Sequence, residues 1–156
     1  VSGAAGVDVL SFGGTKNGMM YGEAVVFFDK SLAKNFEFIR KQGMQLASKM
    51  RYISAQFSAF LTDDVWLQNA SQANAMAQLL AGQLRSIPGI EVSEKVEANM
   101  VYAVIPNRCI TKLQKRYYFH RFNERTCEVR LMCSFSTQPQ EVLGFAEAIR
   151  DAVGEK

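Results

Sequence analysis

The sequence has few of the residues that build metal centres and disulfide frameworks. Among its 156 residues are one histidine and three cysteines, Cys109, Cys127 and Cys133, which show no C-x-x-C spacing. An odd number of widely spaced cysteines excludes a disulfide framework and a zinc knuckle, and it is typical of a reducing compartment. We interpret the cysteines as small buried hydrophobic residues.

Long apolar runs and a strong charge of one sign are also missing. No segment reaches the roughly 20 apolar residues of a membrane span, and the first ten residues lack the basic start and apolar centre of a signal peptide. The net charge is +3, from 18 basic and 15 acidic residues, which is too small to demand an acidic partner. We therefore expect a cytoplasmic globular protein that binds neither membrane nor nucleic acid.

The first part of the sequence predicts two neighbouring strands. Residues 7–12 and 22–28 are rich in β-branched and aromatic residues, as in strands that are covered on both faces. The chain also begins at Val1 rather than at methionine and enters such a strand within a few residues. We expect it to be a piece of a longer protein.

Two long helices are predicted after the strands. Ser31 is placed to cap an amphipathic helix whose apolar stripe continues to Phe57, with Gly43 as a weak point. Residues 62–64, Thr-Asp-Asp, interrupt the pattern, and an Ala-rich helix is predicted from there to Pro88. These elements define a first domain, residues 1–90.

The remaining residues, 91–156, predict a second domain of α+β class. A β-α-β-β-α order follows from the alternation of strand and helix patterns, and the helices are expected to cover one face of a short sheet. The segments are a strand at 99–105, a helix at 107–116, strands at 117–122 and 127–135, and a closing helix from 137.

Lys16 lies between the two predicted strands, in the stretch SFGGTKNG. Asn17-Gly18 is typical of a two-residue hairpin turn, which makes Lys16 a solvated lysine near the tip. Gly13, Gly14 and Gly18, however, clear side chains from around the amine, as suits the close approach of a ligand. The phosphate-loop pattern G-x-x-x-x-G-K-[ST] is not met, so nucleotide binding is not expected.

Arg130 is a second isolated charge. Strand alternation places it with Met132 on one face of its strand and Val129 and Leu131 on the other. It is either a solvent-facing arginine on an open sheet or a fork that binds a carboxylate bidentately, and spacing alone does not choose. His120 lies on the preceding strand and is a weak candidate for a base.

The run KLQKRYYFHRF, residues 112–122, mixes cations and aromatic rings as RNA-binding sheets do. It also fits a helix end whose basic residues offset the helix dipole, followed by an ordinary strand, and this second interpretation is the stronger. A nucleic-acid module centred on Tyr118 and Phe119 therefore stays as an alternative. An interaction or dimerisation module is another, because a truncated sheet exposes an edge that seeks a partner.

Four stretches resemble one enzyme family in wording and in order. DVLSFGGTKNG with GEAVVFF, GMQLASKMRYISAQ, WLQNASQANAMAQLLAGQL and VRLMCSFSTQPQEV are similar to the pyridoxal-phosphate (PLP) lysine region and later segments of the low-specificity L-threonine aldolases, within the beta-eliminating lyase family. The resemblance covers nearly the whole chain. It implies the C-terminal portion of an aspartate-aminotransferase-like fold, with the rest of the large domain before the small α+β domain.

The resemblance also implies roles for individual residues. Lys16 matches the lysine that holds PLP covalently, and Thr15 is placed to donate a hydrogen bond to the cofactor. Arg130 falls where the family binds the substrate carboxylate. Arg40 and Lys41 lie near a basic residue that reaches the cofactor phosphate, often across a subunit interface. The implied reaction is cleavage of L-threonine, L-allo-threonine or a related β-hydroxy-α-amino acid to glycine and an aldehyde, with no metal.

The chain departs from the family pattern in several ways. Everything before the lysine strand is missing, including the phosphate-binding loop and the aspartate that pairs with the pyridine nitrogen. We therefore expect this chain alone to be inactive and the complete enzyme to be a homo-oligomer, a dimer or tetramer. Gln72 and the stretch YYFHRFN differ from the expected wording, which leaves the choice of substrate open. Another PLP-dependent lyase or a racemase of the same fold stays an alternative, because the reaction that follows cofactor binding depends on residues outside this chain.

Overall fold

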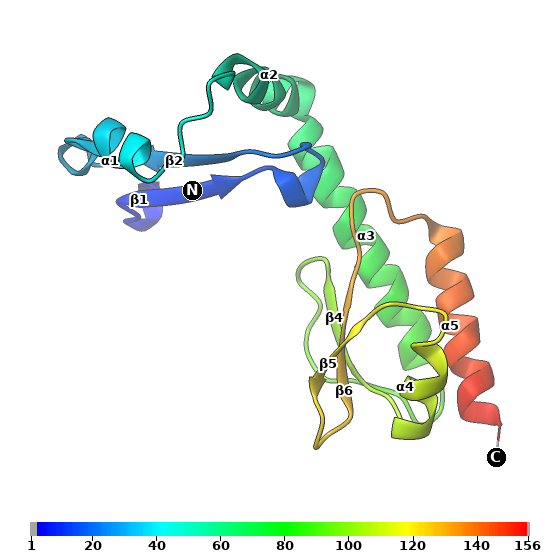
Figure 1. Ribbon diagram of the computed structural model, residues 1–156. Coiled ribbons are helices and arrows are strands. Elements are labelled where there is room, and N and C mark those ends of the chain that lie inside the picture. Colours follow the sequence, from blue (N-terminus) through cyan, green and yellow to red (C-terminus); the bar gives the residue numbers. More distant parts are fainter. Residues whose placement is uncertain (1–2, 156) are drawn as a thin grey trace. The chain divides into compact units, whose positions relative to one another are not determined.

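The computed structural model describes residues 3–155 and divides into two compact units, Val1–Trp66 and Leu67–Lys156. The division falls within a single long helix, α3 (Val65–Arg85), whose first two residues belong to the first unit. The sequence predicts a different boundary, near residue 90, between the large and small domains of the complete protein. That boundary stays a prediction. Each unit is described by itself (Figure 1).

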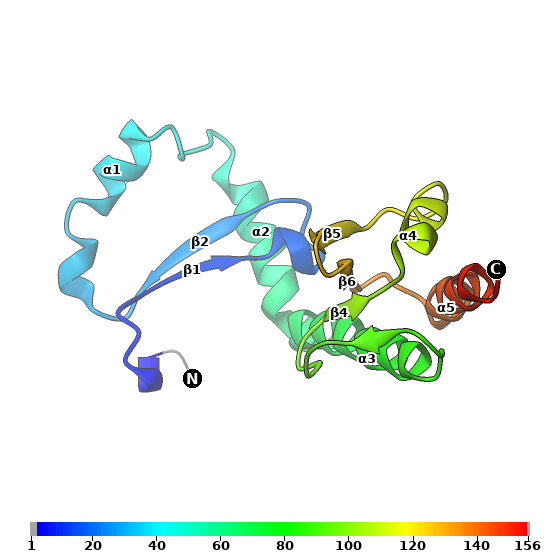
Figure 2. The same ribbon diagram turned by 90° about the horizontal axis from the view of Figure 1, so that it is seen from below.

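The first unit contains the two predicted strands. β1 (Val9–Gly13) and β2 (Glu23–Phe27) pair antiparallel, with Val9 opposite Phe27 and Gly13 opposite Glu23. Figure 2 shows them side by side, joined by the connection that carries Lys16. The prediction that they are neighbours is confirmed.

The prediction of one continuous helix from Ser31 to Phe57 is wrong. The segment forms a 3-10 turn, Lys30–Ala33, then α1 (Phe36–Gln42) and α2 (Met50–Leu61). Asp29 rather than Ser31 is the N-cap, since its carboxylate accepts the Ser31 N–H at 2.8 Å.

Residues with positive φ explain the breaks in this segment. Asn35 (φ 67°) precedes α1, and Met44 (φ 56°) follows it. Between them Gly43 ends α1, and its N–H donates to the Ile39 carbonyl at 2.8 Å. The apolar spacing alone therefore overestimated the length of the helix, because it does not report left-handed backbone.

The interruption predicted at residues 62–64 is confirmed. Thr62–Asp64 forms a 3-10 turn between α2 and α3, and Asp63 and Asp64 have positive φ angles of 51° and 56°. Aspartate tolerates this conformation better than most residues. The chain thereby ends one helix and starts the next without a long loop.

The second unit is an antiparallel sheet covered by helices on one face (Figure 1). Its strand order is β3-β4-β6-β5. The predicted β-α-β-β-α order is confirmed, and the short β3 is an addition that the sequence did not indicate. The elements are β3 (Glu91–Val92), β4 (Met100–Val104), α4 (Asn107–Leu113), β5 (His120–Asn123), β6 (Glu128–Met132) and α5 (Pro139–Gly154).

The core of this unit lies between the sheet and the helices α3, α4 and α5. Val101 and Ala103 of β4 and Val129 of β6 are fully buried, together with Leu84 of α3 and Ile149 of α5. Burial of the valine, leucine and isoleucine side chains among these contributes about 1.5–3 kcal/mol each. The inward and outward alternation predicted for the last strand is confirmed, since Val129 and Leu131 are buried while Arg130 and Met132 are not.

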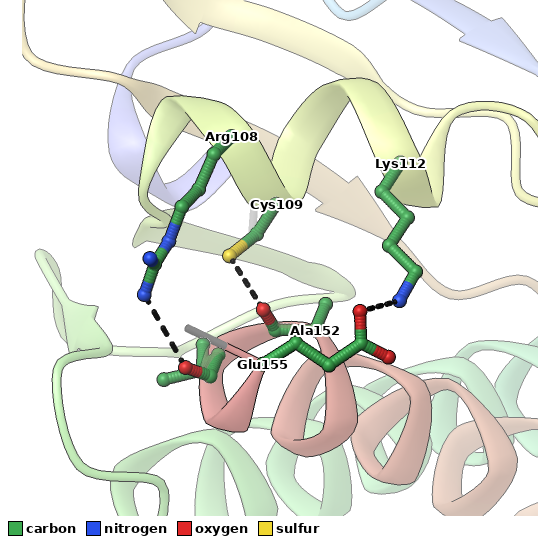
Figure 3. A network of polar contacts seen from close by, with 6 residues as sticks. Arg108, Cys109, Lys112, Ala152 and Glu155 are labelled. Atoms are coloured by element: carbon green, nitrogen blue, oxygen red, sulfur yellow. Dashed lines mark hydrogen bonds and ion pairs between the residues drawn. The ribbon is translucent and has the colours of Figure 1, made fainter.

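Polar contacts join α4 to α5 at the end of the chain (Figure 3). The Cys109 thiol donates to the Ala152 carbonyl at 3.2 Å, and Lys112 forms an ion pair with Glu155. Cys109 and Cys133 are buried as predicted, whereas Cys127 is half-buried, and all are free thiols. Of the helices between residues 3 and 155, none combines the length and apolar character that crossing a bilayer requires.

Candidate functional site

Lys16 is presented by an ordered connection between β1 and β2. Residues Thr15–Asn17 form a 3-10 turn, which Gly18 ends at φ 114°. Gly14 and Gly22 close the base of the connection, because the Gly14 N–H donates to the Gly22 carbonyl at 3.1 Å. The connection is therefore longer than the two-residue hairpin turn that Asn17-Gly18 favoured.

Side chains from α2 and α3 hold this connection in place. Gln56 of α2 accepts hydrogen bonds from the N–H groups of Met20 and Tyr21, at 3.0 and 3.3 Å. The Asn17 amide donates to the Trp66 carbonyl in the first turn of α3, at 2.9 Å. The backbone that follows Lys16 is consequently held in place, which lowers the entropy lost when the side chain binds a ligand.

Met19 fills the space that the glycines leave inside the connection. A Cβ on Gly14 would lie 2.0 Å from Met19 Sδ, and one on Gly22 would lie 2.8 Å from Met19 Cε. Met19 is itself only 7% exposed. Gly14 and Gly22 thus make room for the Met19 side chain. The sequence had suggested that the glycines beside Lys16 leave room for a ligand.

The Lys16 side chain is exposed, and it makes no hydrogen bond or ion pair with the residues that the structure describes. Its amine is available to an aldehyde. The neighbouring Thr15 is also exposed, and its hydroxyl oxygen accepts the Gly22 N–H at 3.1 Å. That bond orients the hydroxyl while leaving its hydrogen free to be donated.

Arg40 and Lys41 lie in the last turn of α1, in the same unit as Lys16. Within residues 3–155, no hydrogen bond or ion pair joins them to Lys16 or Thr15. Arg40 Nε is buried without a hydrogen-bond partner among these residues. Buried donors are normally paired, so this nitrogen lacks the partner that its burial calls for.

Arg130 belongs to the second unit and projects from the face of the sheet that the helices leave open. On this face Tyr102 of β4 and His120 of β5 lie directly opposite it, on either side of β6. Arg130 is a half-buried residue, and its guanidinium has no hydrogen-bond or ion-pair partner in the described part of the chain. A partly buried arginine without a partner is more typical of a site that binds an anion than of a solvent-facing surface position.

Three cations of the run 112–122, Lys112, Arg116 and Arg121, are engaged within the unit. Lys112 pairs with Glu155, and the Arg121 guanidinium donates to Asn107 Oδ1 at 2.7 Å and to Thr111 Oγ1 at 3.3 Å. Arg116 lies over the Tyr117 ring at 5.4 Å. His120 contacts the Tyr118 hydroxyl at 3.4 Å. This pattern supports the helix-end interpretation over a basic nucleic-acid surface.

A cavity of about 320 Å³ lies beside the end of β6 and the start of α5. Its walls include Phe119, Phe145 and Cys133, and burial raises the pKa of the Cys133 thiol. Its polar groups are already bound, since Thr137 Oγ1 accepts the Ser134 N–H and the Glu141 carboxylate accepts that of Gln138. We assign no ligand to it.

The chain is similar in sequence to known proteins of one kind. No family model matches the chain. Two curated proteins do: a low-specificity L-threonine aldolase of a Pseudomonas species, 44% identical over 147 residues, and one of Pseudomonas aeruginosa, 43% identical over 155 residues. These alignments cover 94% and 99% of this chain. The resemblance to the low-specificity L-threonine aldolases is confirmed.

The chain spans less than half the length of these threonine aldolases, 42% and 44%. A solved threonine aldolase structure from Leishmania major shares the fold, with a TM-score of 0.86 and 26% identity over 94% of this chain and 44% of that one. The predicted fold is therefore confirmed as part of the threonine aldolase fold.

Sequence reasoning missed the residues that support the threonine-aldolase-like lysine region. Gln56 and Met19 act through backbone contacts and packing, which no spacing in the sequence reports. Tyr102 was part of a predicted strand, and its position opposite Arg130 follows only from the register. The one available signal was the alternation along the strand of Arg130, which predicted the face that Arg130 shares with Met132.

Proposed function

We propose that the full-length protein to which this chain belongs is a PLP-dependent aldolase. It cleaves L-threonine, L-allo-threonine or a related β-hydroxy-α-amino acid to glycine and an aldehyde. The observation that carries the proposal is the position of Lys16, which lies in the connection between two neighbouring strands with its amine unpaired. The similarity over nearly the whole chain supports it.

The residues of this chain fit PLP. Lys16 would hold the cofactor covalently, because a lysine amine, once deprotonated, is the nucleophile that an aldehyde requires. Hydrogen bonds from α2 and α3 fix the backbone that carries this amine. The Thr15 hydroxyl has a free hydrogen to donate, and Arg40 has an unpaired Nε that suits a phosphate. Lys41, next to Arg40, adds a second positive charge. PLP, when bound, accepts the electron pair released as the Cα–Cβ bond breaks.

Arg130 would bind the α-carboxylate of the substrate. Its fork of N–H donors matches a carboxylate bidentately, and the half-buried position strengthens the attraction relative to open solvent. Binding through the carboxylate orients the amino acid without engaging its β-substituent. The side chain of the substrate is therefore selected by other residues.

We further propose that the complete enzyme is a cytoplasmic homo-oligomer. The first unit exposes large apolar side chains, among them Phe38 (60%), Met44 (89%) and Tyr52 (60%). Apolar surface on this scale is typical of a face that other protein covers. The free thiols of the chain support a reducing compartment.

The proposal is tested with the full-length protein, PLP and L-threonine. We expect release of glycine and acetaldehyde in equal amounts, and loss of this activity in Lys16→Ala but not in the control Lys49→Ala, which removes an exposed lysine at the start of α2. Arg130→Lys should raise KM because a lysine cannot bind a carboxylate through two parallel hydrogen bonds.

Two other products define the alternatives. Release of ammonia and a keto acid would indicate a β-eliminating lyase of the same fold, and conversion of L-threonine to D-allo-threonine without glycine would indicate a racemase that inverts Cα. Either result overturns the aldolase assignment while retaining the role of Lys16.

A further inference from the structure

The open face of the sheet in the second unit carries opposite charges close together that do not pair. Glu128 and Arg130 both project from this face of β6, two residues apart, so their Cα atoms are separated by about 7 Å. Side chains of this length readily form an ion pair across that distance. Both are half-buried, yet no ion pair joins them or any other partner to either one within the described residues.

An aromatic pair crosses β6 between the two charges. Tyr102 of β4 and Phe122 of β5 come from the strands on either side of β6, which are about 10 Å apart. Their rings nevertheless meet edge to face, with centroids 4.8 Å apart. The two side chains must therefore lean toward each other over the backbone of β6.

The register fixes where the crossing falls. Tyr102 lies opposite Arg130, whereas Phe122 follows Arg121, which lies opposite Val129, at an irregularity of the ladder. The crossing therefore starts on β4 at the level of Arg130 and ends on β5 between the levels of Val129 and Glu128. An edge-to-face pair of this kind is favourable beyond the burial of its rings, which helps to keep the two rings together.

We propose that the Tyr102–Phe122 pair insulates Arg130 from Glu128, so that the guanidinium stays free to bind an external carboxylate. Both aromatic residues are positioning residues, since they act through Arg130. The inference rests on the proposed role of Arg130 in substrate binding. The insulation explains why Glu128, on the same face of the strand, does not pair with Arg130.

The test removes the insulation and then removes the competing carboxylate. Phe122 is 59% exposed, so Phe122→Ala is expected to fold. In the full-length protein with PLP, this variant lets Glu128 pair with Arg130, and KM for L-threonine should rise about threefold to fivefold with kcat unchanged, the range of a partly exposed ion pair. The double variant Phe122→Ala/Glu128→Gln should restore KM, although it shares any folding defect of the single variant.

A second measurement is independent of catalysis. Arg130 is modified with phenylglyoxal in the same proteins, and its rate is followed by peptide mass spectrometry. We expect slower modification in Phe122→Ala and recovery in the double variant. Glu128→Gln alone and Tyr118→Ala, which truncates a more exposed aromatic residue, should match the unsubstituted protein.

The outcomes separate this inference from the proposed function. If the unsubstituted protein cleaves no β-hydroxy-α-amino acid, the proposed function is wrong. The modification rates of Arg130 then still show whether the aromatic pair keeps Glu128 away from it. A KM or modification rate that Glu128→Gln does not restore in the Phe122→Ala background overturns the insulation, because the aromatic pair would then support the sheet without keeping the charges apart.

Discussion

Replacing Gly14 tests how the lysine connection is packed. The φ of Gly14 is −109°, which any residue adopts, so Gly14→Ala introduces no backbone strain. The new Cβ, however, would lie 2.0 Å from Met19 Sδ and 2.8 Å from Met19 Cγ. Nonbonded atoms prefer about 3.5–4.0 Å, so Met19 must move by about 1.5 Å.

Met19 has little room for this movement. The space near Gly22 is shared with Phe57 and Ile53, which lie 3.1 and 3.3 Å from the position of a Cβ there. Overpacking of this kind costs about 1–3 kcal/mol. At about 2–4 °C per kcal/mol, the melting temperature should fall by about 2–12 °C. Hydrogen exchange should show the loss of protection in β1 and β2.

Gly82→Ala is the matched control. Gly82 lies inside α3, and a Cβ there would meet nothing within 4 Å. The same substitution should stabilise the protein by about 0.5–1 kcal/mol, because alanine loses less backbone entropy than glycine in a helix. The cost of Gly14→Ala should also shrink in a Met19→Ala background. Equal effects of the two glycine substitutions, or a stabilising Gly14→Ala, would refute the packing argument.

Further predictions concern the core, the thiols and the lysine connection. Leu84→Ala should destabilise the second unit by about 2–5 kcal/mol in denaturant unfolding, because Leu84 is fully buried, while Leu143→Ala at an exposed site should change little. Cys127 should react with a thiol reagent at pH 8 before Cys133, because burial raises the pKa of the Cys133 thiol and keeps it protonated, and equal labelling rates would contradict this difference. The buried Cys133 thiol also contributes stability that is fully present below the pKa of the unfolded chain and is lost as the pH rises through the higher folded-state pKa. Gln56→Ala removes the acceptor of two backbone N–H groups and should speed hydrogen exchange at Met20 and Tyr21, whereas unchanged exchange would exclude this role.

The second unit was predictable from sequence because local pattern and tertiary packing agree there. Alternation along β6 placed Arg130 outward and Val129 inward, and both placements are confirmed. The short β3 escaped prediction because a strand of this length carries no period. Its pairing with β4 is set by the sheet and leaves no trace in local composition.

The first unit was less predictable because its breaks depend on single backbone angles. The apolar stripe runs through Asn35 and Met44, yet both adopt positive φ and divide the predicted helix. The glycines beside Lys16 could be seen in the sequence, but the packing that requires Gly14 could not. Gly14 makes room for Met19, a contact that only coordinates reveal.

The central claim is that Lys16 holds the cofactor, and borohydride reduction tests it most directly. Reduction of the full-length protein with bound PLP converts the carbon–nitrogen bond to a stable amine, and peptide mapping then locates the pyridoxyl group. The account predicts the label on Lys16, its loss in Lys16→Ala and its retention in Lys49→Ala. A label on another lysine, with Lys16 unmodified, would contradict it.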